Sequence, residues 1–195
     1  MNGTQVRVGF GLTGSYCTLH KVLQALEQVK QRFGTVTPLL SENCAATDTR
    51  FGSAADLRRE VERICGCPPL LTIAQAEPIG PKKLLDALVI APCTGNTLAK
   101  LAWGITDTTI TMAAKAHLRN GRPLILAVST NDGLTVSLRN LGELSCRRNV
   151  YLVPFRQDDP KGKPASLVAE MDLIPQTVEA ALEGRQLQPV LLGSL

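Results

Sequence analysis

The sequence is poor in the residues that build nucleic-acid and membrane surfaces. Its 195 residues include four Phe, two Tyr and one Trp. So few aromatic residues argue against a surface on which bases stack, and no apolar run approaches the length of a membrane span. The formal net charge of +4 comes from scattered Lys and Arg residues, without the basic patch that typically binds nucleic acid. We therefore expect a protein that binds neither nucleic acid nor a membrane.

Metal-site and secretion signals are also missing. Only two His are present, and six Cys occur without the spacing of a metal site. Cys65 and Cys67 form the one close pair, with no second pair and no nearby His. The first residues lack a basic segment followed by an apolar core, as a secretory signal would have. We expect reduced thiols, no metal site and a cytoplasmic location.

Apolar runs and helical stripes alternate along the chain. This alternation predicts one domain over residues 1–195, a doubly wound, Rossmann-like α/β fold with a mostly parallel sheet and helices on both faces. Residues 157–164 are expected to form a flexible charged loop and residues 166–171 a helix, while the tail from about residue 184 is expected to be flexible. Strands are predicted at residues 5–10, 36–40, 86–91, 123–128 and 149–154.

The predicted strand at residues 86–91 organises the rest of the chain. Pro92 is expected to end it, and Cys93-Thr94-Gly95-Asn96 forms a short polar loop before a helix that begins near Thr97. Free backbone amides and the helix dipole make such a loop an anion and ligand site. Open α/β sheets bind ligands at this carboxyl edge.

A second candidate loop lies near the amino end of the sequence, where residues 9–15 read GFGLTGS. The glycines allow a sharp turn, and Thr13 and Ser15 add hydroxyl donors at a helix start. We expect this loop and residues 93–97 to hold the same molecule. The glycine spacing also satisfies the dinucleotide fingerprint, with Glu42 as its acidic residue, so an NAD(P) site is an alternative. A tight turn without a ligand is another.

Together these two loops and Ser41 resemble the flavoprotein superfamily, which includes cysteine decarboxylases and flavin prenyltransferases. The resemblance is carried by the Gly-x-Thr-Gly-Ser turn at residues 11–15 and the Pro-x-x-x-Asn-Thr-x-Ala-Lys loop at residues 92–100. It implies an FMN cofactor. By resemblance, the phosphate and ribityl end would be held by Gly11, Thr13, Gly14, Ser15 and Ser41. The flavin ring and ribityl chain would be approached by Thr94, Gly95, Asn96 and Thr97.

Catalytic groups of the cysteine decarboxylases are missing. Those enzymes carry a His just before the central strand, where this chain has Ala76-Glu77-Pro78-Ile79. Their Pro-x-Met-Asn motif is reduced here to Asn131. Cysteine decarboxylation is therefore not expected, and no catalytic acid or base can be identified. Cys17 and Cys93 lie in or near the ligand loops, so a nucleophilic role for either is an alternative.

Residues 47–52 and 77–83 are more similar to one branch of the superfamily, the B subunits of a two-subunit synthase of spore-forming bacteria. This resemblance implies action in the mother-cell cytoplasm beside a partner subunit that would bind NAD(P). It also implies a homo-oligomer, trimer or dodecamer, and oxidation of a small dihydropyridine dicarboxylate to its aromatic product. The alternatives are a stand-alone FMN-dependent decarboxylase and a non-catalytic partner subunit. From loop position alone, we expect the substrate carboxylates to be held by Lys82, Lys83, Ser129, Thr130 and Asn131.

Overall fold

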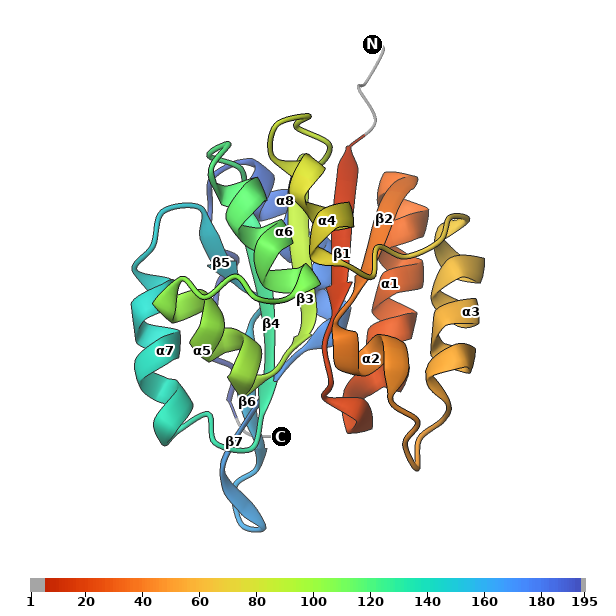
Figure 1. The fold of residues 1–195 in the computed structure, drawn as a ribbon. Coiled ribbons are helices and arrows are strands. Elements are labelled where there is room, and N and C mark those ends of the chain that lie inside the picture. The colour runs from red at the N-terminus through yellow and green to blue at the C-terminus, as the bar shows by residue number, and fades with distance from the viewer. Residues whose placement is uncertain (1–5, 194–195) are drawn as a thin grey trace.

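The computed structural model describes residues 6–193 and is built around a seven-stranded sheet (Figure 1). Five strands are parallel, in the order β2-β1-β3-β4-β5. They are β1 (Arg7–Leu12), β2 (Thr35–Leu40), β3 (Ala87–Cys93), β4 (Leu124–Thr130) and β5 (Val150–Leu152). The doubly wound, mostly parallel sheet predicted from the alternation is confirmed. Its strand order reverses between β1 and β3, the place where open sheets of this kind bind ligands.

Helices cover both faces of the sheet (Figure 1). One face is covered by α1 (Leu19–Phe33) and α8 (Ile174–Leu182), and the other by α5 (Gly95–Trp103), α6 (Thr109–Leu118) and α7 (Val136–Ser145). The β2 side of the sheet carries α2 (Glu42–Ala46) and α3 (Ala54–Cys65), and α4 (Ile73–Ala76) packs on α6. Short 3₁₀ turns are η1 (Tyr16–Thr18), η2 (Glu77–Ile79) and η3 (Met171–Leu173). No helix among residues 6–193 is both long and apolar enough to cross a membrane.

Glycines within β1 allow the core to pack closely. A Cβ at Gly9 would come within 2.4 Å of Leu85, and one at Gly11 within 2.9 Å of Ile110. Both contacts are shorter than real Cβ atoms make, so these glycines leave room for core side chains. β1 therefore extends to Leu12, and the turn predicted over residues 9–15 is confined to residues 13–15.

The end of the chain contains a β-hairpin where a loop and a helix were predicted. β6 (Phe155–Asp159) pairs antiparallel with β7 (Lys163–Ala169), so both predictions are wrong. β7 also pairs with the last two residues of β4, through Ser129 with Val168 and Thr130 with Leu167. This non-local pairing decides the structure of residues 163–169. It brings the hairpin against the carboxyl edge of the sheet.

Smaller differences concern the segments around the central strand. β3 continues through Pro92 to Cys93, with a shift of register against β4 after Ile90. Leu70 forms only an isolated bridge to Leu39, and α4 begins at Ile73. The chain after α8 returns to the sheet, because residues 190 and 192 hydrogen-bond to the backbone of Phe155.

Candidate functional site

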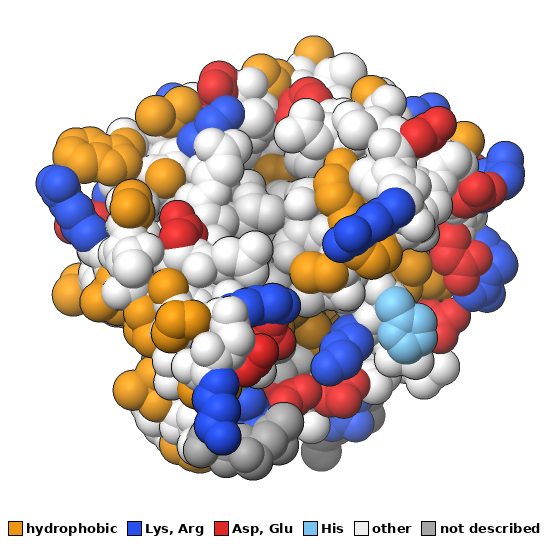
Figure 2. All heavy atoms as spheres, turned by 90° about the horizontal axis from the view of Figure 1, so that it is seen from below, with side chains coloured by type: hydrophobic (Ala, Val, Ile, Leu, Met, Phe, Trp, Pro, Cys, Tyr) orange, Lys and Arg blue, Asp and Glu red, His pale blue; other side chains and the backbone are white. Residues whose placement is uncertain are grey.

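The loops that follow β1, β2, β3 and β4 meet at one edge of the sheet. Figure 2 looks onto this edge from below: the surface is hollowed near its middle, where most atoms are white (backbone, or side chains that are neither charged nor hydrophobic), and charged side chains lie mainly around it. Parallel strands end together at their carboxyl edge, so the four loops are neighbours although they are far apart in sequence. The structure thus brings together the two loops that we expected to hold one molecule.

Thr13 joins the loop after β1 to the loop after β3. Its Oγ1 donates a hydrogen bond to the Pro92 carbonyl oxygen at 2.6 Å and accepts one from the Thr94 amide at 3.2 Å. The side chain is almost completely buried, with 2% of its surface exposed. The Thr13 hydroxyl therefore holds the two loops together. Moving them apart would leave the Pro92 carbonyl or the Thr94 amide without a hydrogen-bond partner, which is costly.

The amino end of α5 points to the same edge. Thr94 caps this helix, since its Oγ1 accepts a hydrogen bond from the Thr97 amide at 3.3 Å. The first amides of a helix, here those of Gly95 and Asn96, have no partner within the helix and suit an anion or a polar ligand. A Cβ on Gly95 would lie 2.7 Å from Thr130 Oγ1, so only glycine lets α5 approach the loop after β4 this closely.

Hydroxyl groups also connect the loop after β4 to its neighbours. Ser129 Oγ lies 3.0 Å from Ser15 Oγ, and Asn131 Oδ1 accepts a hydrogen bond from Ser166 Oγ at 3.2 Å. Asp132 accepts from Thr130 Oγ1 and from Ser137 Oγ, and these hydrogen bonds, Thr130 first, lower the pKa of its carboxyl group. Asp132 and Ser166 were not identified from the sequence, because neither belongs to a motif.

The loop after β2 supplies Ser41 and Glu42. The Ser41 amide donates to the Leu12 carbonyl oxygen at 3.0 Å, which places this loop beside the end of β1. Glu42 Oε1 accepts hydrogen bonds from the amide of Thr109 at 2.8 Å and from its Oγ1 at 2.9 Å. The carboxylate that an NAD(P) fingerprint would direct to a ribose is thus engaged with α6.

Two adjoining cavities open at this edge. The first cavity, of about 360 Å³, is lined by Thr13, Gly14, Ser41, Glu42, Asn43, Thr94, Asn96, Thr97, Lys100, Asp107, Thr108 and Ile110. The second cavity, of about 470 Å³, is lined by Gly14, Ser15, Cys17, Thr18, Lys21, Thr94, Gly95, Ser129, Thr130, Asn131, Asp158, Lys163, Ser166, Leu167, Val168 and Met171. Gly14 and Thr94 line both cavities, so they form a shared wall.

Most of the predicted site residues line these cavities, with three exceptions. Gly11 is buried inside β1 and lines neither cavity. Lys82 and Lys83 precede β3 and are exposed at the amino edge of the sheet, where the Lys83 carbonyl oxygen accepts from Arg122 Nη1 at 3.4 Å. A residue before a parallel strand lies at the opposite edge from the residues that follow it. The expectation that these lysines share a site with Ser129, Thr130 and Asn131 is therefore corrected.

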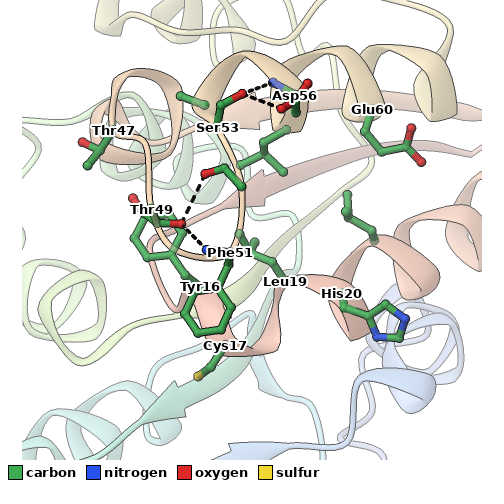
Figure 3. Close-up of a pocket in the computed structure, with 14 residues that line it drawn as sticks. Tyr16, Cys17, Leu19, His20, Thr47, Thr49, Phe51, Ser53, Asp56 and Glu60 are labelled. Atoms are coloured by element: carbon green, nitrogen blue, oxygen red, sulfur yellow. Dashed lines mark hydrogen bonds between the residues drawn. The ribbon is translucent and has the colours of Figure 1, made fainter.

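A third cavity, of about 330 Å³, lies between the start of α1, the loop at residues 47–53 and α3 (Figure 3). Tyr16, Leu19 and Phe51 give it a more apolar lining than the other two cavities. Its loop is held by backbone hydrogen bonds between Thr49 and Gly52. It contains none of the predicted cofactor or substrate residues.

The two cysteines considered as nucleophiles differ in exposure, since Cys17 is exposed and lines the second cavity whereas Cys93 is buried. Cys93 is fully buried, and burial raises the pKa of its thiol to about 12. A thiol with this pKa stays protonated at neutral pH, so Cys93 lacks the thiolate that a nucleophile requires. Within residues 6–193, no group of three or more His, Cys, Asp or Glu side chains is placed to hold a metal ion.

Several known proteins resemble this chain in sequence and in fold. The Flavoprotein family model matches residues 2–174. The chain is 47% identical to the B subunit of dipicolinate synthase from Bacillus subtilis over 186 residues, covering 95% of this chain and 93% of that protein. The crystal structure of the B subunit of dipicolinate synthase from Bacillus halodurans superimposes with a TM-score of 0.89 at 45% identity, covering all of both chains. A dodecameric FMN-dependent UbiX-like decarboxylase from Escherichia coli O157:H7 has a TM-score of 0.55 at 25% identity, covering 76% of this chain and 80% of that one.

Proposed function

We propose that this chain, which belongs to the flavoprotein family, is the FMN-binding subunit of a dipicolinate synthase. The observation that carries the proposal is the first cavity, which lies at the strand-order switch point between β1 and β3. Its walls come from the two loops that resemble flavin-binding loops, and Thr13 connects these loops directly. The 47% identity to the Bacillus subtilis protein over nearly the whole chain supports the same assignment.

The lining of the first cavity fits a flavin mononucleotide. Hydroxyl groups of Ser41 and Thr97 can donate to phosphate and ribityl oxygens, and the amino end of α5 favours negative charge. Lys100 adds a cation to the lining, although its Nζ is paired with Asp107 at 2.8 Å. A volume of about 360 Å³ lies within the range of small-molecule sites.

When bound, FMN would accept a hydride or two electrons, which is the chemistry that oxidation of a dihydropyridine requires. The chain's own residues would position the reactants. Ser129, Thr130 and Asn131 line the second cavity and present hydroxyl and amide groups to a substrate held there. Because Gly14 and Thr94 are the shared wall, a molecule in the second cavity would lie next to the cofactor.

The proposed reaction is oxidation of a dihydrodipicolinate-type precursor to dipicolinate, in the mother-cell cytoplasm of a spore-forming bacterium. The proposed partner is the A subunit of dipicolinate synthase, which would bind NAD(P). The name of the Bacillus subtilis relative, a B subunit, supports the existence of a different partner chain. We also propose a homo-oligomer, a trimer or a dodecamer, supported by the dodecameric relative.

The visible absorption spectrum of the purified protein tests the cofactor. We expect flavin bands that remain after FMN is added and the protein is desalted. A colourless protein that cannot be reconstituted with FMN would overturn the proposal.

Two glycine variants connect that spectrum to the amino end of α5, which reaches the first cavity through Asn96 and Thr97. Gly95→Ala places a Cβ within 2.9 Å of Thr130, Asp132 and Ser137, so it should displace α5 from the loop after β4. We expect weaker FMN retention by at least tenfold in dissociation constant, about 1.4 kcal/mol. Gly142→Ala is the matched control in α7, where an added Cβ meets nothing within 4 Å. Equal retention by both variants would argue against the assignment.

A separate titration distinguishes this function from a non-catalytic partner role. The A subunit is assayed by itself and with this chain, each with and without FMN. We expect full synthase activity only when both the chain and FMN are present. Activation by the flavin-free chain to the same level would assign it a structural role.

A further inference from the structure

The second cavity contains two cations that no sequence motif indicated. Among its lining residues the charged ones are Lys21, Lys163 and Asp158. They come from three elements, since Lys21 lies in the first turn of α1, Asp158 in β6 and Lys163 at the start of β7. The fold thus brings an excess of one positive charge to a cavity whose other lining groups are uncharged.

We infer that Lys21 and Lys163 each bind one carboxylate of a small planar dicarboxylate in the second cavity. This inference rests on the proposed function and deepens it, because it names the groups that recognise the substrate class. The two lysines replace Lys82 and Lys83, which lie at the other edge of the sheet.

Lys21 is available for such a ligand. Its side chain is exposed, and among residues 6–193 no carboxylate lies within 4.0 Å of its Nζ. An exposed ammonium group carries three hydrogen-bond donors. A carboxylate that enters the cavity can therefore pair with Lys21 without breaking an existing ion pair.

Lys163 forms an ion pair with Asp158 that a ligand carboxylate could replace. Its Nζ lies 2.9 Å from Asp158 Oδ2, and 56% and 43% of the two side chains are exposed. Exposed ion pairs contribute little net stability, so a ligand carboxylate can take the place of Asp158 at low cost. We expect a substrate carboxylate to take the position on Lys163 that the Asp158 carboxylate holds in this structure.

Neutral groups complete the second cavity. The hydroxyls of Ser15 and Ser129 lie 3.0 Å apart, and Ser166 Oγ donates to Asn131 Oδ1. One hydroxyl of the Ser15–Ser129 pair donates to the other, so the pair keeps one hydrogen that can be donated to a carboxylate or a ring nitrogen. A volume of about 470 Å³ admits one six-membered ring with two carboxylates. The shared wall, Gly14 and Thr94, then places this ring beside the first cavity.

The test measures binding of pyridine-2,6-dicarboxylate to the FMN-loaded protein, by calorimetry and by perturbation of the flavin spectrum. Lys21→Gln and Lys163→Gln should each weaken binding about tenfold or more, because each removes one charge-assisted hydrogen bond. Asp158→Asn should strengthen binding, because the competing carboxylate is removed. Flavin retention should be unchanged in all three variants.

A ligand with one carboxylate sharpens the assignment. Pyridine-2-carboxylate has one carboxylate and can pair fully with one lysine, so it should bind more weakly than the dicarboxylate. Replacing both lysines should lower its affinity by a smaller factor than the affinity of the dicarboxylate. Lys161→Gln, on the same hairpin but outside the cavity lining, and Lys82→Gln, at the amino edge, are the matched controls. Both should bind like the wild type.

Specific outcomes would overturn the inference. Wild-type affinity in both Lys21→Gln and Lys163→Gln would do so, as would an equal loss in the Lys161→Gln control. If the wild-type chain fails to retain FMN, the proposed function fails, and calorimetry on the flavin-free chain still tests the lysines. A selective loss in the two lysine variants would then support a dicarboxylate site without a flavin.

Discussion

The polar groups at the two edges of the sheet differ in whether they pair mainly with other protein groups or face open cavities. At the amino edge, the Asp86 carboxylate accepts hydrogen bonds from the Arg7 amide at 2.9 Å and from the Arg7 guanidinium at 2.8 and 3.0 Å, and one from Arg122 at 3.0 Å. His117 is fully buried there and its Nε2–H donates to the Pro123 carbonyl oxygen at 3.0 Å. Asp86 and the two arginines thus satisfy one another across the ends of β1, β3 and β4, whereas the buried Nδ1 of His117 has no hydrogen-bond partner among the described residues.

At the carboxyl edge, comparable groups line open space. Ser15, Ser129 and the amino end of α5 make few internal bonds and face two cavities. Polar groups that are left without protein partners at a surface are available to a ligand. This difference indicates that the amino edge contributes mainly to the stability of the fold and the carboxyl edge mainly to ligand binding. The following predictions test that division, starting with the largest effect.

The amino edge should dominate the pH dependence of stability through His117. Burial, followed by a weaker repulsion from Arg122 and opposed by the hydrogen bond to Pro123, lowers the pKa of His117 from 6.5 to about 4. The unfolded chain binds this proton first, so stability present above pH 6.5 falls as the pH drops toward about 4, by about 3 kcal/mol. Urea unfolding of the wild type and His117→Gln across this range measures it. The same slope in both proteins would contradict the assignment.

Thr13→Val should affect both stability and binding, because Thr13 belongs to the carboxyl edge. The variant leaves the Pro92 carbonyl and the Thr94 amide without their partner, which should cost about 1–3 kcal/mol. FMN retention should fall as the two loops separate. Thr13→Ser keeps the hydroxyl and should retain most of both properties. Urea unfolding and desalting with FMN measure the two effects, and a stable Thr13→Val that binds FMN normally would refute the connecting role of Thr13.

Asp86→Asn should give the smallest effect, and only on stability. Hydrogen bonds from Arg7, foremost, hold the pKa of Asp86 below its usual range, but the side chains are 28% to 41% exposed and solvent screens the pair. We expect a loss of about 1 kcal/mol at neutral pH that shrinks in high salt, with FMN retention unchanged. Urea unfolding at two salt concentrations measures it. A loss of FMN retention would break the division between the two edges.

Much of the fold could be predicted from sequence because the parallel strands are local, strongly apolar signals. Every residue of β3 is buried, and the run from Ala87 to Ala91 shows this directly. The hairpin of β6 and β7 could not be predicted in this way. Residues 157–164 are charged and rich in turn residues, and β7 is stabilised by pairing with Ser129 and Thr130, more than thirty residues earlier in the chain.

The first cavity was largely predictable and the second cavity only in part. Thr13, Ser41, Thr94 and Thr97 follow strands, and the ends of parallel strands necessarily meet. The same rule places Lys82 and Lys83 at the wrong edge, because they precede a strand. Lys21 and Lys163 lie on a helix and a hairpin whose approach to the site depends on tertiary packing. No local pattern marks them.

The origins of the two cavity linings differ along the chain. The lining of the first cavity ends at Ile110, whereas that of the second cavity extends through the hairpin to Met171. On the ribosome, all lining residues of the first cavity are therefore synthesised before any residue of β4, and those of the second cavity are complete only after β7. In the proposed function, the cofactor compartment would have its walls earlier in synthesis than the substrate compartment. The order in which the two cavity linings are completed therefore follows the order of their residues in the chain.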